Sequence, residues 1–160
     1  MPRFRIGDMW TVYPAADLFL VTTNATITTR GALVMGQGIA RQAKERFPGL
    51  DIALGRQIQA LCGNLCVYGL LVSPRWPEAK LGAFQVKRHY SQPASLELIR
   101  RSTAALCTWC ANHPDACVHL NFPGIGYGHL HRENVLPIIA QLPDQVTVWE
   151  YPPVCKENVL

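Results

Sequence analysis

The alternation of hydrophobic and polar positions along the chain predicts six strands. Apolar or alternating runs of four to eight residues, bounded by turn residues, are typical of strands. Such runs lie at Arg3–Ile6, Leu18–Thr23, Leu65–Val72, Gly82–Val86, Cys117–Phe122 and Gln145–Tyr151. The run Leu18–Thr23 is apolar without clear alternation, which indicates a strand buried on both faces.

Between these strands the hydrophobic residues recur at spacings of three and four, which predicts helices. The expected helices are Gly38–Phe47, Asp51–Leu61, Ala94–Asn112 and His131–Leu142. The longest should bury a stripe formed by Leu96, Ile99, Thr103, Leu106 and Cys110. Pro137 in the last segment marks a bend or an offset start. Alternating strands and helices predict an α/β fold with a largely parallel or mixed sheet, whose ligands bind beyond the carboxyl ends of the strands.

Composition places the chain among globular proteins of one domain. It has 160 residues, of which 49% are hydrophobic and 16% charged, and a net charge of +4 that is compatible with a phosphate-bearing ligand. No apolar run approaches the length of a membrane span, and the N-terminal residues lack the features of a signal peptide. We therefore expect one domain over residues 1–160, with 151–160 as a short C-terminal tail, a cytoplasmic location and no contact with a membrane.

The six cysteines predict reduced thiols rather than disulfides, since no secretion signal is found. Two pairs have spacings that suggest zinc, namely Cys62/Cys66 and Cys107/Cys110. The second pair lies in a segment with helical periodicity and no turn, so small apolar core residues are the favoured interpretation. We expect no metal.

Two glycine-rich segments each follow a predicted strand region and precede a predicted helix. In "VMGQGIA" Gly36 and Gly38 lie just before the first helix, and in "NFPGIGYGH" three glycines separate a strand from the last helix. Glycine permits positive φ and lets a ligand touch the backbone, while the unpaired first amides of a helix attract anions. Together the two segments suit a diphosphate. They match neither the dinucleotide-binding Rossmann fingerprint nor a P-loop.

The segments "TTN", "ALVMGQGIARQAKERFPGL" and "FPGIGYGHLHRENVLPII" together resemble a macro domain, a module that binds ADP-ribose. The segment "FQVKRHYSQPASLELI" resembles the lysine-bearing segment of the DNA ADP-ribosyl glycohydrolase antitoxins and, more distantly, of terminal ADP-ribose protein glycohydrolase. The likeness extends from about Ile6 to Trp149. It implies a three-layer α-β-α fold with a mixed central sheet of about six strands.

The resemblance also implies roles for particular residues. Asp8 corresponds to the aspartate that binds the adenine amino group, and Trp149 to an aromatic residue that stacks on adenine. Asn24 faces the distal ribose, and Lys87 corresponds to the catalytic lysine of the glycohydrolases. The implied ligand-binding residues are Asp8, Met35, Gly36, Gln37, Gly38, Ile39, Gly124, Ile125, Gly126, Tyr127, Gly128 and Trp149.

Each of these residues has a structural alternative. Asp8 follows a glycine and suits the cap of a turn, and Asn24 at a strand end is equally suited to forming a turn. Trp149 suits the core, and a single lysine such as Lys87 is ordinarily a solvated surface charge. Lys87 nevertheless ends an apolar strand, where a functional group is expected. As a nucleophile or base it needs a lowered pKa, which burial and the adjacent charge of Arg88 would both produce.

One departure from the resemblance leaves the function open. The protein-directed glycohydrolase has an aspartate just after its second glycine loop, whereas this chain reads "GYGHLHREN" there. His129 or His131 could supply acid–base chemistry instead, or His131 could simply start a helix.

The leading hypothesis is a cofactor-free glycohydrolase that removes ADP-ribose from a macromolecule. Modified DNA is one candidate target, and an ADP-ribosyltransferase toxin is the implied partner. The alternatives are a non-catalytic reader of ADP-ribose or a related nucleotide signal, an ADP-ribose-1″-phosphate phosphatase, and an unrelated α/β domain.

Overall fold

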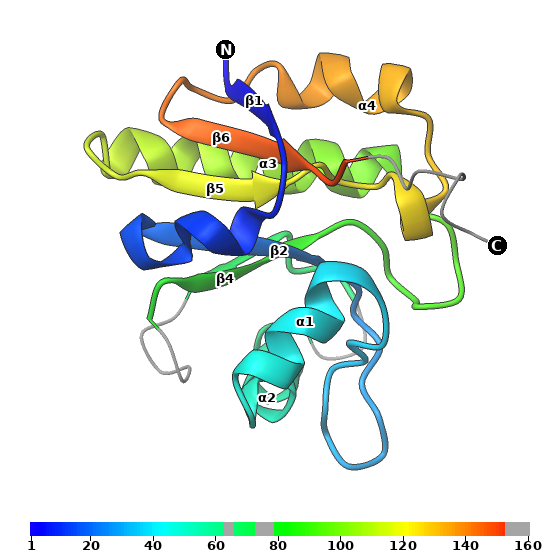
Figure 1. The fold of residues 1–160 in the computed structure, drawn as a ribbon. Helices are drawn as coiled ribbons and strands as arrows, with labels where there is room; N and C mark the ends of the chain where they lie inside the picture. Colours follow the sequence, from blue (N-terminus) through cyan, green and yellow to red (C-terminus); the bar gives the residue numbers. More distant parts are fainter. Residues whose placement is uncertain (63–65, 73–78, 153–160) are drawn as a thin grey trace, which may run out of the picture.

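A six-stranded mixed sheet forms the middle layer of the protein (Figure 1). The computed structural model describes residues 1–62, 66–72 and 79–152. The strands are β1 (Arg3–Ile6), β2 (Leu18–Thr23), β3 (Leu70–Val72), β4 (Leu81–Gln85), β5 (Val118–Asn121) and β6 (Val146–Glu150). Their order is β1-β6-β5-β2-β4-β3, with every neighbouring pair parallel except β3 and β4. The predicted α/β class and mixed sheet are confirmed.

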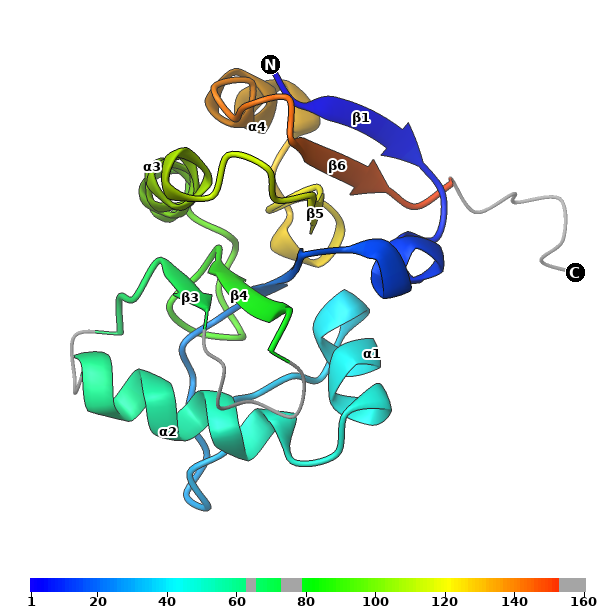
Figure 2. The same ribbon diagram turned by 90° about the vertical axis from the view of Figure 1, so that its left-hand side faces the viewer.

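Helices cover both faces of the sheet (Figure 2). The α-helices are α1 (Gly38–Arg46), α2 (Leu50–Cys62), α3 (Leu96–Asn112) and α4 (Arg132–Ile139). Helices α1 and α2 lie on one face together with the 3-10 helix η1 (Met9–Ala15), while α3 and α4 lie on the other. A second 3-10 helix, η2 (Gly126–Gly128), precedes α4.

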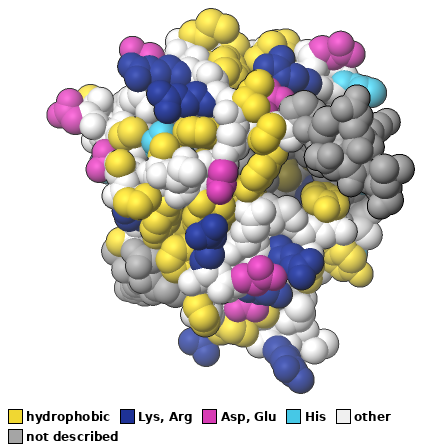
Figure 3. All heavy atoms as spheres, in the orientation of Figure 1, with side chains coloured by type: hydrophobic (Ala, Val, Ile, Leu, Met, Phe, Trp, Pro, Cys, Tyr) yellow, Lys and Arg dark blue, Asp and Glu magenta, His cyan; other side chains and the backbone are white. Residues whose placement is uncertain are grey.

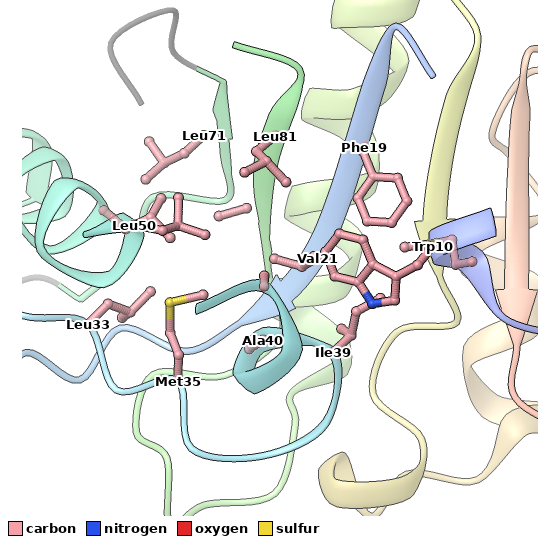
Figure 4. Packing of buried hydrophobic residues seen from close by; sticks show 14 of the residues in the cluster. Trp10, Phe19, Val21, Leu33, Met35, Ile39, Ala40, Leu50, Leu71 and Leu81 are labelled. Carbon is pink, nitrogen blue, oxygen red and sulfur yellow. The ribbon is translucent and has the colours of Figure 1, made fainter. Parts of the chain in front are cut away.

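Strand β2 contributes side chains to both hydrophobic cores because alternate side chains of a strand point to opposite faces of the sheet. Phe19 and Val21 pack in the core under α1, α2 and η1, and Leu18 and Leu20 pack in the core under α3 and α4. All four side chains are at most 1% exposed. Figure 4 shows the first core, where Trp10 of η1 lies beside the Phe19 ring, with a centroid separation of 4.6 Å. This double burial explains why β2 is an unbroken apolar run.

Helix α3 buries the predicted stripe with one exception. Ile99, Thr103, Leu106 and Cys110 are at most 2% exposed, whereas Leu96 at the first turn is only half-buried. Ser95 caps this helix by accepting a hydrogen bond from the Leu98 amide at 3.3 Å.

The structure differs from the predicted elements in three places. The strand expected over Leu65–Val72 is only Leu70–Val72, because Cys66, Tyr68 and Gly69 bond to the Gln85 side chain, and Cys66 and Gly69 have positive φ. Leu65 lies outside the described residues. Both 3-10 helices escape a search for 3.6-residue periodicity. Of the two expectations for Pro137, the offset start is wrong, because Pro137 lies inside α4.

The cysteines that the structure describes are free thiols. Cys62 and Cys110 are buried in the two cores, as the core interpretation predicts. Within residues 1–62, 66–72 and 79–152, no three His, Cys, Asp or Glu side chains gather to hold a metal ion. No helix in that part of the chain is long and apolar enough to cross a bilayer. The predicted tail falls mostly on residues 153–160, which are outside the described part.

Candidate functional site

A cavity of about 780 Å³ opens at the carboxyl ends of the central strands. The end of β2, the two glycine segments, Lys87 and residues 149–151 form its walls. This is the edge of the sheet at which α/β proteins bind their ligands. Almost all of the predicted site residues line this cavity, including Met35–Ile39 and Gly124–Gly128 of the two glycine segments.

The first glycine loop, Met35–Ile39, is anchored at its ends and open in its middle. Met35 and Ile39 are buried in the first core, while Gly36 and Gln37 are exposed at the cavity. Gln37 occupies the N-cap position of α1 without a side-chain capping bond. Among the described residues, none accepts a hydrogen bond from the amides of Ile39 and Ala40. These donors sit at the positive end of the helix, which suits an anionic ligand.

The second glycine loop, Gly124–Gly128, is shaped by packing. Gly124 has φ +79°, and a Cβ there would lie 2.7 Å from the Cδ1 atom of Ile99. Gly126 has φ +65° and open space around it, so the backbone conformation favours glycine there and no neighbouring protein atom requires it. No described residue accepts a hydrogen bond from the amides of Gly126 and Tyr127.

The two loops meet at Tyr127. A Cβ placed on Gly38, whose φ is +61°, would lie 3.4 Å from Cδ2 of the Tyr127 ring. The Tyr127 side chain is 59% exposed, so it is a surface side chain resting on the other loop. A ligand between the loops would therefore face backbone N–H donors from both loops, with the Tyr127 side chain at the point where the loops meet.

Lys87 places its amine beside the second loop. Its Nζ atom donates hydrogen bonds to the carbonyl oxygens of Tyr90, at 3.3 Å, and Tyr127, at 3.4 Å. Burial lowers the pKa of Lys87 because the charged amine loses solvation. The neighbouring charge of Arg88, expected to add to this effect, is not among the causes of the shift. The one carboxylate lining the described cavity is that of Glu150, which accepts from Arg132 Nε at 2.8 Å.

Asn24 lines the cavity at the end of β2 and also forms a turn, the structural alternative drawn from its sequence position. Its Oδ1 atom accepts from the Thr26 amide at 2.9 Å, and its Nδ2 atom donates to the Val34 carbonyl at 3.0 Å. The second Nδ2 hydrogen is not used by either bond. One lone pair of Oδ1 is also unused by these bonds, and the role of Asn24 at the ribose remains a prediction.

Asp8 and Trp149 are placed differently from the other predicted residues. Asp8 is exposed, lies outside the cavity lining, and caps η1 by accepting from the Trp10 amide at 3.0 Å. Trp149 lines the cavity but is 7% exposed, and its indole N–H donates to His119 Nδ1 at 2.9 Å. Burial, with a smaller contribution from Arg5, lowers the pKa of His119, which favours the neutral ring that accepts this bond. Adenine binding by Asp8 and Trp149 stays a prediction.

The two candidate histidines lie outside the cavity lining, and some residues that were not predicted line the cavity. His129 and His131 are exposed and outside the cavity lining, and His131 stands at the N-cap position of α4. Tyr90, Ser91 and Tyr151 line the cavity although the sequence did not single them out. Tyr90 and Ser91 follow closely after Lys87, which was the one signal for them.

Similar solved structures agree with this arrangement. The macrodomain of Mycobacterium tuberculosis DarG matches with a TM-score of 0.70 and 26% identity over 96% of this chain and 98% of that one. The chain has the macrodomain fold. The macrodomain of Thermus aquaticus DarG matches with a TM-score of 0.63 and 24% identity over 96% of this chain and 99% of that one.

Another similar structure was solved with a bound ligand. Thermosipho africanus DarTG, solved in complex with ADP-ribose, matches this macrodomain with a TM-score of 0.67 and 17% identity. The match covers 96% of this chain and 43% of that one. No protein-family model matches the sequence, and no curated protein does. The predicted resemblance to the macrodomains of DNA ADP-ribosyl glycohydrolase antitoxins is confirmed at the level of structure.

Proposed function

We propose that this macrodomain binds ADP-ribose between its two glycine loops and removes ADP-ribose from a modified macromolecule with Lys87. The observation that carries the proposal is the position of the Lys87 amine, which shares one cavity with both loops. The likeness to DarG macrodomains supports the same activity at a coarse level.

The loops suit the diphosphate of ADP-ribose. Each offers backbone amides without a described protein acceptor, and α1 adds the positive end of its dipole. Binding energy from the diphosphate would hold the distal ribose against Lys87, which makes the chemical step intramolecular.

In the proposed reaction the neutral amine of Lys87 attacks C1″ of the distal ribose. A bond forms between Nζ and C1″, the bond from C1″ to the target breaks, and the target leaves with a proton from the amine. Water then displaces the amine at C1″ and returns a proton to it. One water molecule is consumed, and free ADP-ribose and the unmodified target are released. Burial favours the neutral amine that this step needs.

The test compares two lysines of the same strand region. Lys87→Ala is expected to reduce hydrolysis at least about 100-fold while calorimetry gives an ADP-ribose Kd within about threefold of the original. Lys80→Ala is the matched control, because the Lys80 amine donates to the Tyr13 and Pro14 carbonyls rather than facing the cavity. Full activity in Lys87→Ala would remove the proposed role of Lys87.

A second candidate function is a reader that binds ADP-ribose without turnover. It is favoured by the absence of a free carboxylate in the described cavity lining, since Glu150 is paired with Arg132. Tight ADP-ribose binding together with no hydrolysis of ADP-ribosylated DNA, RNA or protein would establish this function.

The target and partner belong to the same proposal. We propose ADP-ribosylated DNA as the first target to test and an ADP-ribosyltransferase toxin as the partner, in the cytoplasm. The support is the likeness to DarG macrodomains and to the DarTG structure. On the face shown in Figure 3, Lys and Arg side chains lie in separate groups among hydrophobic and acidic ones. That face therefore offers no continuous basic track to a DNA backbone.

A further inference from the structure

Gln85, the last residue of β4, is the most buried amide side chain near the cavity. It is 0% exposed, although it belongs to a residue type that is ordinarily at the surface. Gln85 lies two residues before Lys87 in the sequence and pairs with Thr23 of β2 in the sheet. A fully buried polar side chain needs a complete set of hydrogen bonds, so its hydrogen-bond partners show which segments of the chain it holds together.

All four hydrogen-bonding positions of the Gln85 amide are occupied. Its Oε1 atom accepts from the amides of Tyr68, at 2.8 Å, and Gly69, at 3.0 Å. Its Nε2 atom donates to the carbonyls of Cys66, at 2.7 Å, and Lys87, at 3.2 Å. Two N–H donors face one end and two carbonyls the other, so the orientation of the amide is fixed. Gln85 thus ties residues 66–69 to the backbone of Lys87.

Tyr68 extends the same network to Asn24. Its hydroxyl donates to the Asn24 carbonyl at 2.6 Å and is also bonded to the Thr23 hydroxyl. Because the single phenol proton is used on Asn24, the Thr23 hydroxyl is the donor in the second bond. Burial raises the pKa of Tyr68, which keeps this proton in place. Tyr68 is absent from the cavity lining, so it stands behind the site.

We infer that Gln85 and Tyr68 are positioning residues, which hold Lys87 and Asn24 in a fixed relation from behind the cavity. The inference rests on the proposed hydrolysis, because it assigns these two residues to that reaction. Neither residue touches the ligand space, so each acts through the backbone of a residue that does. A displacement of about 1 Å at a reacting group can cost about 100-fold in rate, which gives such support its value.

Tyr68→Phe tests the inference because it removes one hydroxyl and keeps the ring. We expect kcat to fall about tenfold, while KM and the ADP-ribose Kd stay within about twofold. Tyr13→Phe is the matched control, since Tyr13 packs in the aromatic cluster around Trp10 and Phe47, away from the cavity. Equal kcat values for the two variants would overturn the inference.

A double-mutant cycle separates positioning from general destabilisation. In an Asn24→Ala background the Tyr68 hydroxyl has lost the side chain it positions, so Tyr68→Phe should reduce kcat by less than about twofold. The same tenfold loss in both backgrounds would show that Tyr68 does not act through Asn24.

Hydrogen exchange gives a readout that does not depend on turnover. The Thr26 amide donates to Asn24 Oδ1, so Tyr68→Phe should speed its exchange at least about fivefold while the amides of α4 are unchanged. If the original protein binds ADP-ribose without hydrolysing any substrate, the proposed hydrolysis fails. The exchange of the Thr26 amide then decides separately whether Tyr68 fixes Asn24, and an unchanged rate would overturn that.

Discussion

At the scale of single residues, the environment of Lys87 determines when its amine is neutral. Lys87 is a half-buried residue, and among the described residues its amine is bonded only to the carbonyl groups of Tyr90 and Tyr127. Carbonyl oxygens accept hydrogen bonds from the charged amine, but they carry no negative charge to balance it. The loss of solvation is therefore the cause of the shift in the pKa of Lys87. The pKa of Lys87 is therefore lowered from the ordinary 10.5.

This shift has a definite consequence for the pH dependence of hydrolysis. As the pH rises through the lowered pKa of Lys87, the neutral fraction of its amine grows, so kcat should rise with a midpoint below pH 10.5. Lys87→Arg stays charged over the whole range. Its residual rate should be low and independent of pH. A pH profile of kcat for both proteins checks this, and a rate that falls as pH rises would contradict a neutral amine nucleophile.

Other single residues show where sequence reasoning is limited. Asp8 and Asn24 were each given a ligand role and a turn role, and the structure has both in turns. Short polar side chains bond to nearby backbone and face a ligand with the same atoms, so residue type alone does not separate the two roles. Gln85 and Tyr68 went unnoticed because their bonds join segments 17 and 44 residues apart in the sequence.

At the scale of elements, the glycine loops contain glycines with two different purposes. A Cβ at Gly36 would meet no protein atom within 4 Å, although Gly36 lines the cavity. A Cβ at Gly124 would lie 2.7 Å from Ile99 Cδ1 and 2.9 Å from Leu130 Cδ1. Gly36 leaves open space in the cavity where a ligand is proposed to bind, whereas Gly124 leaves space for Ile99 of α3 and for Leu130, which precedes α4.

Alanine at each position separates these purposes. Gly36→Ala should leave the melting temperature within about 1 °C and raise the ADP-ribose Kd about tenfold, because only the ligand meets the added methyl group. Gly124→Ala should lower stability by about 1–3 kcal/mol through overpacking and positive-φ strain. Calorimetric titration and thermal unfolding of both variants check this. Unchanged affinity in Gly36→Ala would mean that the ligand does not approach that backbone.

The elements themselves were largely predictable because their signals are local. The strand β2 and the helix α3 follow from an apolar run and a stripe with helical spacing, and both were found close to their predicted bounds. The strand before β4 was predicted too long. Cys66, Tyr68 and Gly69 form hydrogen bonds with the Gln85 side chain, and regular pairing with β4 begins only at Leu70. Tertiary partners overrode local propensity there.

At the scale of the whole molecule, the cavity joins the two halves of the fold. The first glycine loop leads into α1 on one face of the sheet, and the second leads toward α4 on the other. A ligand held by both loops therefore binds only the folded chain, and its binding free energy adds to the free energy of unfolding.

This coupling predicts the size of a thermal shift. At a concentration of ADP-ribose about 100 times its Kd, the stabilisation is about 2.7 kcal/mol. For a chain of this size that corresponds to a rise in melting temperature of about 5–11 °C. AMP at the same concentration should give a much smaller rise, because it lacks the second phosphate and the distal ribose. Equal shifts for the two nucleotides would contradict binding across both loops.

The pairing of β1 with β6 has a consequence for synthesis of the chain. β1 lies at one edge of the sheet, and among the described strands it pairs only with β6, whose residues Val146–Glu150 are translated about 140 positions later. At about 5–20 residues per second, the first strand waits on the order of ten seconds for its partner to leave the ribosome. Trp149, on that same late strand, completes the cavity wall. A nascent chain can therefore assemble the central strands β2 and β4 early, but its cavity wall is complete only after β6 has been translated.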